Sequence, residues 1–201
     1  MGTIAEGTVT VGGQKVNVKA DFASDHVLFS GGRRGEVPYS KIEVVGTAKG
    51  TLRLRVDGAL MEFKLGDKTE RIAAKVRKPP TLMDKLGVKP GLSVAVVGVE
   101  AKPFLRELEA AAPEFIDGEP GRPVDLLFLG VRGRDELGDL ASLVPLLKPD
   151  GGLWIVYPKG RGDLHGAILD AGRAAGLKDV KVARVSTELT SSKFVRPLDA
   201  R

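Results

Sequence analysis

The Pro79-Pro80 pair divides this chain into two segments with different hydrophobic periods. Adjacent prolines lack backbone N–H groups and interrupt both helices and strands. Before the pair, apolar and polar residues alternate in short runs; after it, long apolar runs alternate with helical patterns. A chain of 201 residues has room for two compact units. We therefore predict an α+β protein with a first domain over residues 1–78, a linker over 79–84 and a second domain over 85–201.

The first segment has the pattern of an antiparallel β meander. Asp57-Gly58 stands between two alternating runs and is a strong signal for a two-residue hairpin. Residues 66–76 then carry apolar side chains at helical spacing, which predicts a helix that packs across the sheet. The predicted strands cover residues 8–11, 15–20, 27–30, 41–45, 51–56 and 59–65. We expect a meander or barrel closed by this C-terminal helix.

Residues 27–29 (VLF), residues 36–42 (EVPYSKI) and the hairpin that leads into the last helix resemble a pleckstrin-homology-like or GRAM-like domain. The resemblance implies a protein partner or a phosphoinositide headgroup. Headgroup binding needs a concentrated basic loop, and Arg33 and Arg34 are its only candidates here. We therefore favour a protein partner for this domain.

The excess positive charge lies entirely in the first segment. The net charge of the chain is +5, and residues 81–201 contain as many acidic as basic residues. Lys15, Lys19, Arg53 and Arg55 lie in alternating runs, which is typical of a solvated sheet face. A nucleic-acid or anionic-lipid surface is the alternative, but a binding surface of this kind usually has aromatic platforms or a recognised motif, and neither is present. Nucleic acid is thus the less favoured partner.

The second segment alternates strand and helix patterns, which predicts an α/β domain with a parallel sheet covered by helices on both faces. Residues 92–99 (LSVAVVGV) and 124–131 (VDLLFLGV) read as strands buried on both faces. Further strands are predicted at 115–116, 153–157, 180–185 and 193–195. Helices are predicted after Pro103, over 137–147 and over 163–175.

Residues 147–156 (LKPDGGLWIV) and the closing hairpin resemble S-adenosylmethionine-dependent methyltransferases, whose fold is Rossmann-like. With residues 86–91 (LGVKPG) and 154–159 (WIVYPK), the segment also resembles an uncharacterised bacterial family of small methyltransferase-like domains without an assigned activity. The resemblance covers most of residues 82–197. It implies a three-layer sandwich and a cofactor site after the first strand.

The expected cofactor loop departs from the enzymatic pattern. A working loop carries closely spaced glycines so that the backbone can approach the ligand. Here only Gly98 is present, and Glu100 and Lys102 carry side chains where that approach is needed. Glu114 and Asp117 are weak candidates for the acidic residue that holds the ribose. The segment between the first predicted helix and Val124 is too short for a complete second strand and its helix, so we predict a truncated domain.

The carboxyl ends of the predicted parallel strands nevertheless bring candidate residues together. In open α/β sheets ligands bind at this edge. The cofactor-binding candidates are Gly98, Glu100, Gly130 and Tyr157. The anion-binding candidates are Arg132, Lys159 and Arg161, the last two lying just before a predicted helix. A solvated loop is the alternative explanation for the second group.

The residue types that the sequence lacks limit the kinds of chemical site that it can form. Without cysteine there is no disulfide or thiolate site, and His165 has no His or Cys partner nearby in the sequence, so we expect no metal. The catalytic residues stay unknown. No leader and no run of about eighteen apolar residues is present, so we expect a cytoplasmic protein without a membrane span.

Three functions follow as hypotheses. We favour a non-catalytic protein-interaction or small-ligand module that uses no cofactor. The alternatives are a methyltransferase that holds S-adenosylmethionine in an altered pose, and a nucleic-acid-binding protein that uses the basic first segment.

Overall fold

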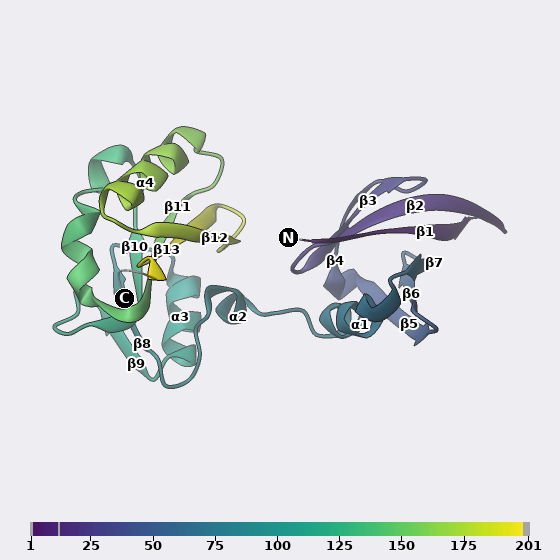
Figure 1. The fold of residues 1–201 in the computed structure, drawn as a ribbon, viewed down its shortest axis with the longest axis horizontal. Helices are drawn as coiled ribbons and strands as arrows, with labels where there is room; N and C mark the ends of the chain where they lie inside the picture. The colour runs from purple at the N-terminus through teal and green to yellow at the C-terminus, as the bar shows by residue number, and fades with distance from the viewer. Residues whose placement is uncertain (1, 12, 199–201) are drawn as a thin grey trace. The chain divides into compact units, whose positions relative to one another are not determined.

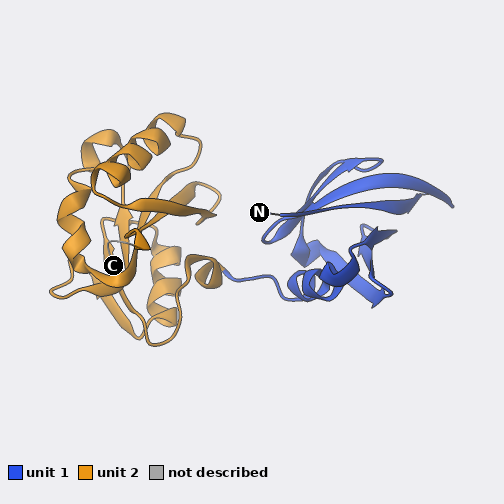
Figure 2. Cartoon of the chain, viewed as in Figure 1, with its two compact units in different colours: residues 1–81 blue, residues 82–201 orange. Residues whose placement is uncertain are grey.

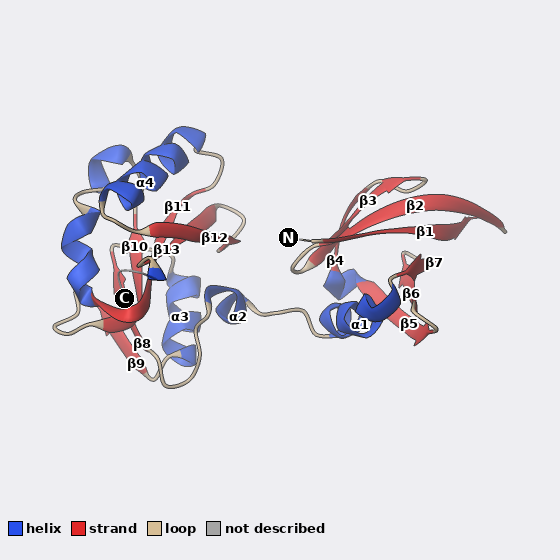
Figure 3. Cartoon of the chain, in the orientation of Figure 1, coloured by secondary structure: helices blue, strands red, loops and turns tan. Residues whose placement is uncertain are grey.

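The chain divides into two compact units, with the boundary after Thr81 (Figure 2). The computed structural model describes residues 2–11 and 13–198. Its architecture is mixed α/β: a curled antiparallel sheet with a helix in unit 1, and a mostly parallel sheet with helices in unit 2 (Figures 1 and 3). None of the helices in the described residues combines the length and apolar character needed to cross a bilayer.

Unit 1 folds into one curled antiparallel sheet. Along the sheet the strands follow the order β4-β3-β2-β1-β7-β6-β5, so that β1 joins a four-strand meander to a three-strand meander. The elements are β1 (Thr3–Val11), β2 (Gln14–Phe22), β3 (His26–Gly31), β4 (Gly35–Pro38), η1 (Tyr39–Lys41), β5 (Ile42–Ala48), β6 (Thr51–Val56), β7 (Ala59–Lys64), η2 (Gly66–Lys68) and α1 (Thr69–Arg77).

Strand alternation explains the core of unit 1. Side chains on one face of the sheet, such as Phe22 and Phe63, are fully buried, and their rings meet edge to face at 5.4 Å. Ile72, on the inner face of α1, belongs to the same core. The predicted Asp57-Gly58 hairpin is confirmed: both residues have positive φ, and Val56 pairs with Ala59.

Unit 2 has a parallel sheet extended by an antiparallel hairpin. The strand order is β12-β13-β11-β10-β8-β9; β9, β8, β10 and β11 run parallel, and β13 runs against β11 and β12. The elements are α2 (Leu82–Leu86), β8 (Ser93–Val97), α3 (Lys102–Ala111), β9 (Glu114–Asp117), β10 (Val124–Gly130), η3 (Arg134–Glu136), η4 (Leu140–Leu146), β11 (Leu147–Pro158), α4 (Gly162–Ala174), β12 (Lys178–Arg184) and β13 (Leu189–Val195).

Helices cover both faces of this sheet because its central strands are apolar on both sides. Phe104 of α3 packs with Phe128 on one face, at 5.6 Å between ring centroids. Leu164 and Ile168 of α4 pack with Leu127 on the other face. The α/β prediction for this segment therefore agrees with the parallel strands and their two helical layers.

Two local predictions for unit 2 were wrong. In place of the α-helix predicted over 137–147 the chain forms the 3-10 segment η4, because Gly138 takes a positive φ and Pro145 has no N–H for an α-helical ladder. The strand predicted at 153–157 begins earlier, at Leu147, and contains a bulge: Val124 pairs with Leu147, and Leu126 pairs with Gly152.

Candidate functional site

The candidate site of unit 2 is the edge where its parallel strands end. After β8 the chain crosses to β9 on one side, whereas β10 connects to β11 on the other side. The loops after β8 and β10 therefore diverge. In open α/β sheets such a switch point is where ligands enter.

Gly98 and Gly130 meet at this switch point. Gly98 follows β8 with a φ of +68°, and Gly130 is the last residue of β10. A Cβ atom on Gly130 would lie 2.1 Å from the Gly98 carbonyl oxygen and 2.8 Å from the Val99 nitrogen. The two backbones are thus in direct contact. The backbone after β8 thus lies against the end of β10, one position beyond the paired residues Val97 and Leu129, and we call this contact the closed switch point.

An ion-pair cluster joins the same two loops. The Nη1 group of Arg132, after β10, donates to Glu100, after β8, at 3.1 Å. Its Nε and its backbone N–H donate to the two carboxylate oxygens of Glu136 at 2.9 and 2.8 Å. The hydrogen bond to Glu136 and the charge of Glu100 raise the pKa of Arg132. Arg132, predicted to bind an anion, is therefore already held by two carboxylates of its own chain.

The other predicted anion-binding residues lie at the start of α4. Arg161 donates from Nε and Nη2 to the two carboxylate oxygens of Asp163, each at 3.1 Å. This bidentate pair lowers the pKa of Asp163. The side chain of Lys159 is exposed, and its backbone N–H donates to the Glu188 carbonyl at 2.7 Å.

Tyr157 lies apart from the other cofactor-binding candidates. Its side chain is buried in the core beside Leu164 of α4. The hydroxyl forms hydrogen bonds with Nδ1 of His165 at 2.6 Å and with Oγ of Ser192 at 3.0 Å. Ser192 was not among the predicted site residues, because its position opposite Ile155 is determined by the β11–β13 register and leaves no local signal in the sequence.

A cavity of about 690 Å³ opens beside the closed switch point. It lies between the start of α3 and the turn that joins β12 to β13. Its lining includes Leu82, Glu100, Lys102, Phe104, Arg132 and Glu188. Glu100 and Arg132 thus line a cavity that could receive a ligand of moderate size.

S-adenosylmethionine would need two things at this edge: an acidic group for its ribose and a close approach of the backbone after β8. Asp117 is the last residue of β9 and pairs with Val96 near the end of β8, where an acidic group can reach a ribose. Glu114 lies at the other end of β9 and pairs with Arg122 at 3.0 Å. The close backbone approach after β8, however, is taken by the Gly98–Gly130 contact. For that approach the loop after β8 offers Gly98 alone, in place of the closely spaced glycines of a glycine-rich loop.

Across residues 2–11 and 13–198, His, Cys, Asp and Glu side chains form no group of three that could hold a metal ion.

Comparison with known proteins gives a likeness of fold. No family model matches the chain, and no curated protein sequence matches it. Several solved structures do match, among them S-adenosylmethionine-dependent methyltransferases.

One is the methyltransferase from Aquifex aeolicus, with 17% identity, a TM-score of 0.44, and coverage of 56% of this chain and 86% of that chain. A methyltransferase from Pyrococcus furiosus shares 14% identity over 58% of this chain and 80% of that chain, with a TM-score of 0.40. The fibrillarin pre-rRNA processing protein of Methanococcus jannaschii matches over 89% of this chain and 94% of its own, at 13% identity and a TM-score of 0.41. Such low scores assign no activity.

Proposed function

We propose that unit 2 is a truncated methyltransferase-like Rossmann domain that works as a non-catalytic module for binding a protein or a small ligand. We further propose that unit 1 is a pleckstrin-homology-like domain. The two joined meanders and α1 support the second proposal. The parallel sheet with its closing hairpin supports the first.

The closed switch point carries the proposal. Catalysis with a bound cofactor requires that the cofactor's reacting group reach a substrate in a defined position at this edge. In this chain the carbonyl of Gly98 already lies against Gly130, and the Glu100–Arg132 pair joins the two loops above them. A ligand that entered between these two loops would have to break both contacts.

Titration calorimetry with S-adenosylmethionine and S-adenosylhomocysteine tests this proposal. We expect no heat of binding at ligand concentrations up to about 1 mM, which corresponds to a binding free energy weaker than about −4 kcal/mol. A methyltransferase of known affinity, titrated in the same buffer, is the positive control. Binding at micromolar strength would contradict the proposal.

A methyltransferase with an atypical cofactor site is the second candidate. Two separate features favour it: the cavity beside α3 offers space for a ligand, and Asp117, which is not part of its lining, offers a carboxylate at the end of β9. If the titration does detect binding, Asp117→Asn decides between poses. A loss of about tenfold in affinity, which is 1.4 kcal/mol, supports ribose contact at β9. An unchanged affinity excludes it.

A further inference from the structure

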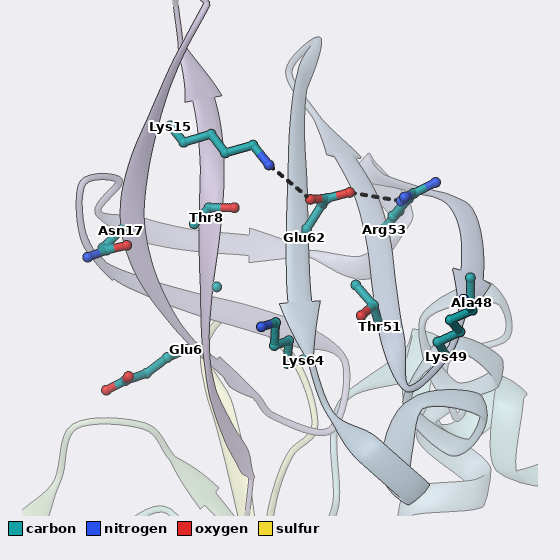
Figure 4. Close-up of a pocket in the computed structure, with 11 residues that line it drawn as sticks. Glu6, Thr8, Lys15, Asn17, Ala48, Lys49, Thr51, Arg53, Glu62 and Lys64 are labelled. Atoms are coloured by element: carbon teal, nitrogen blue, oxygen red, sulfur yellow. Dashed lines mark hydrogen bonds and ion pairs between the residues drawn. The ribbon is translucent and has the colours of Figure 1, made fainter.

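The outer face of the unit 1 sheet carries a groove with a particular charge pattern. Strand alternation points Glu6 and Thr8 of β1, Glu62 and Lys64 of β7, and Arg53 of β6 away from the core. With Lys15, Asn17, Lys49 and Thr51 these residues line a hollow of about 570 Å³, the outer-face groove (Figure 4). A second hollow of about 380 Å³ adjoins it, adds Lys19 and shares Glu6 and Asn17.

Glu62 is the centre of the outer-face groove. Lys15 reaches it from one side at 3.6 Å, and Nε of Arg53 donates to it from the other side at 2.9 Å (Figure 4). The Glu62 side chain is only 29% exposed, whereas that of Lys15 is 67% exposed. Two basic groups from different strands thus already converge on one carboxylate, and Lys49 and Lys64 add positive charge to the same lining.

We propose that the outer-face groove binds an acidic segment of a partner protein, whose carboxylates are recognised by Lys15, Lys64 and Arg53. The proposal concerns unit 1 and stands whether or not unit 2 has an activity. Charge complementarity supports it, because four basic residues and two acidic residues line the groove.

The lining favours a peptide over a run of phosphates. Thr8, Asn17 and Thr51 can both donate and accept hydrogen bonds, which matches the amide and carbonyl groups of a peptide. Phosphate oxygens only accept, and a continuous phosphate chain would meet the charges of Glu6 and Glu62. The lining also contains no aromatic side chain on which a base could stack. These features disfavour nucleic acid.

The size of the groove sets the length of the segment. It crosses β2, β1, β7 and β6, and neighbouring strands lie about 4.8 Å apart, so its span is about 14 Å. An extended peptide advances about 3.4 Å per residue, so about four residues would fill it. Because successive side chains of an extended peptide point to opposite sides, alternating acidic and neutral residues would turn the carboxylates toward the basic groups of the groove and the neutral side chains away from it.

The test uses the full chain and a fluorescent peptide of alternating glutamate and serine, followed by anisotropy at low and at physiological salt. We expect binding that weakens with salt. The double variant Lys15→Gln/Arg53→Gln should lose affinity about tenfold, since it removes two charge contacts. The matched control Arg71→Gln/Lys78→Gln removes the same charge from exposed residues outside the groove and should change affinity less than about twofold.

For Glu62→Gln we expect the opposite change, a rise in affinity for the peptide. This variant therefore distinguishes direct recognition of the peptide from a general effect of removing ion pairs. If Glu62 competes with the ligand, its neutralisation frees Lys15 and Arg53, and affinity for the peptide should rise about threefold or more. Equal or weaker binding by Glu62→Gln would overturn the proposal. It would also fall if the control variant lost as much affinity as the groove variant, or if an oligonucleotide of equal charge bound more tightly than the peptide.

Discussion

Gly130 shows how a single residue closes the edge of unit 2. A methyl group at this position would overlap the Gly98 carbonyl, which is backbone and cannot turn aside. We therefore expect Gly130→Ala to destabilise unit 2 by about 3 kcal/mol or more, because packed backbone tolerates little displacement. Urea unfolding followed by the fluorescence of Trp154, the only tryptophan, measures this change.

Gly166→Ala is the matched control for that experiment. Gly166 lies in α4, and a Cβ atom there would meet no other atom within 4 Å. Because alanine favours helix over glycine, this variant should be neutral or stabilised by up to about 1 kcal/mol. A similar loss of stability in both variants would mean that the Gly98–Gly130 contact is looser than its geometry indicates.

For the single residues of the candidate site, the sequence predicted their position in the fold better than what they do there. It placed Gly98, Glu100, Gly130 and Arg132 at the carboxyl edge, and the structure brings them together. It could not show that the backbones of the two loops touch, because that contact depends on how residues far apart in the sequence meet. Tyr157 was grouped with them because it ends a strand, but strand register turns its side chain into the core.

Asp125 of β10 connects three neighbouring strands of unit 2 through its carboxylate. One of its carboxylate oxygens accepts hydrogen bonds from the backbone N–H and Oγ of Ser93 in β8, at 2.8 and 2.7 Å, and from Lys148 in β11, at 2.7 Å. Burial alone would raise the pKa of Asp125, but the hydrogen bonds from Lys148 and Ser93 outweigh it and lower the pKa. The ionised form therefore stabilises the fold.

Asp125→Asn should reduce the free energy of unfolding of unit 2 by about 2 kcal/mol at pH 7, because it removes charge-assisted hydrogen bonds. A lowered folded-state pKa gives stability that is complete above the unfolded pKa and is lost as pH falls through the folded one. The difference between wild type and variant should therefore shrink below about pH 4. Urea unfolding over a pH series measures it, with the exposed Asp170→Asn as control. A difference independent of pH would contradict this role.

Among the elements, the alternating hairpin of β6 and β7 was predicted, whereas the short elements α2 and β4 were not. The alternation of β6 and β7 and the glycine turn between them determine that hairpin locally. In contrast, α2 and β4 are too short to show a period. The helix α2 depends on a distant residue, since Trp154 donates from Nε1 to the Leu86 carbonyl at 3.1 Å. Such long-range contacts leave no local signal.

On the scale of the whole molecule, each unit has its own buried core. The core of unit 1 contains buried residues from Ala5 to Val76, and the two cores of unit 2 contain buried residues from Leu86 to Phe194. No buried cluster among the described residues draws on both units. Since a domain's stability comes chiefly from apolar burial in its own core, each unit has what it needs to fold alone.

We therefore expect chains 1–81 and 82–201 to fold when they are produced separately. Each should unfold cooperatively in urea, and unit 1 should be the less stable, because a domain of about 80 residues buries a smaller fraction of its surface. Circular dichroism reports both chains, and Trp154 fluorescence reports unit 2 alone. If chain 82–201 unfolds at the same urea concentration as that fluorescence signal in the full chain, unit 2 folds independently of unit 1. A lower urea midpoint for chain 82–201 would show that unit 2 needs unit 1, and a chain 1–81 without cooperative unfolding would show that unit 1 needs unit 2. In either case the stability of the outer-face groove and of the strand edge of unit 2 would have to be measured in the full chain.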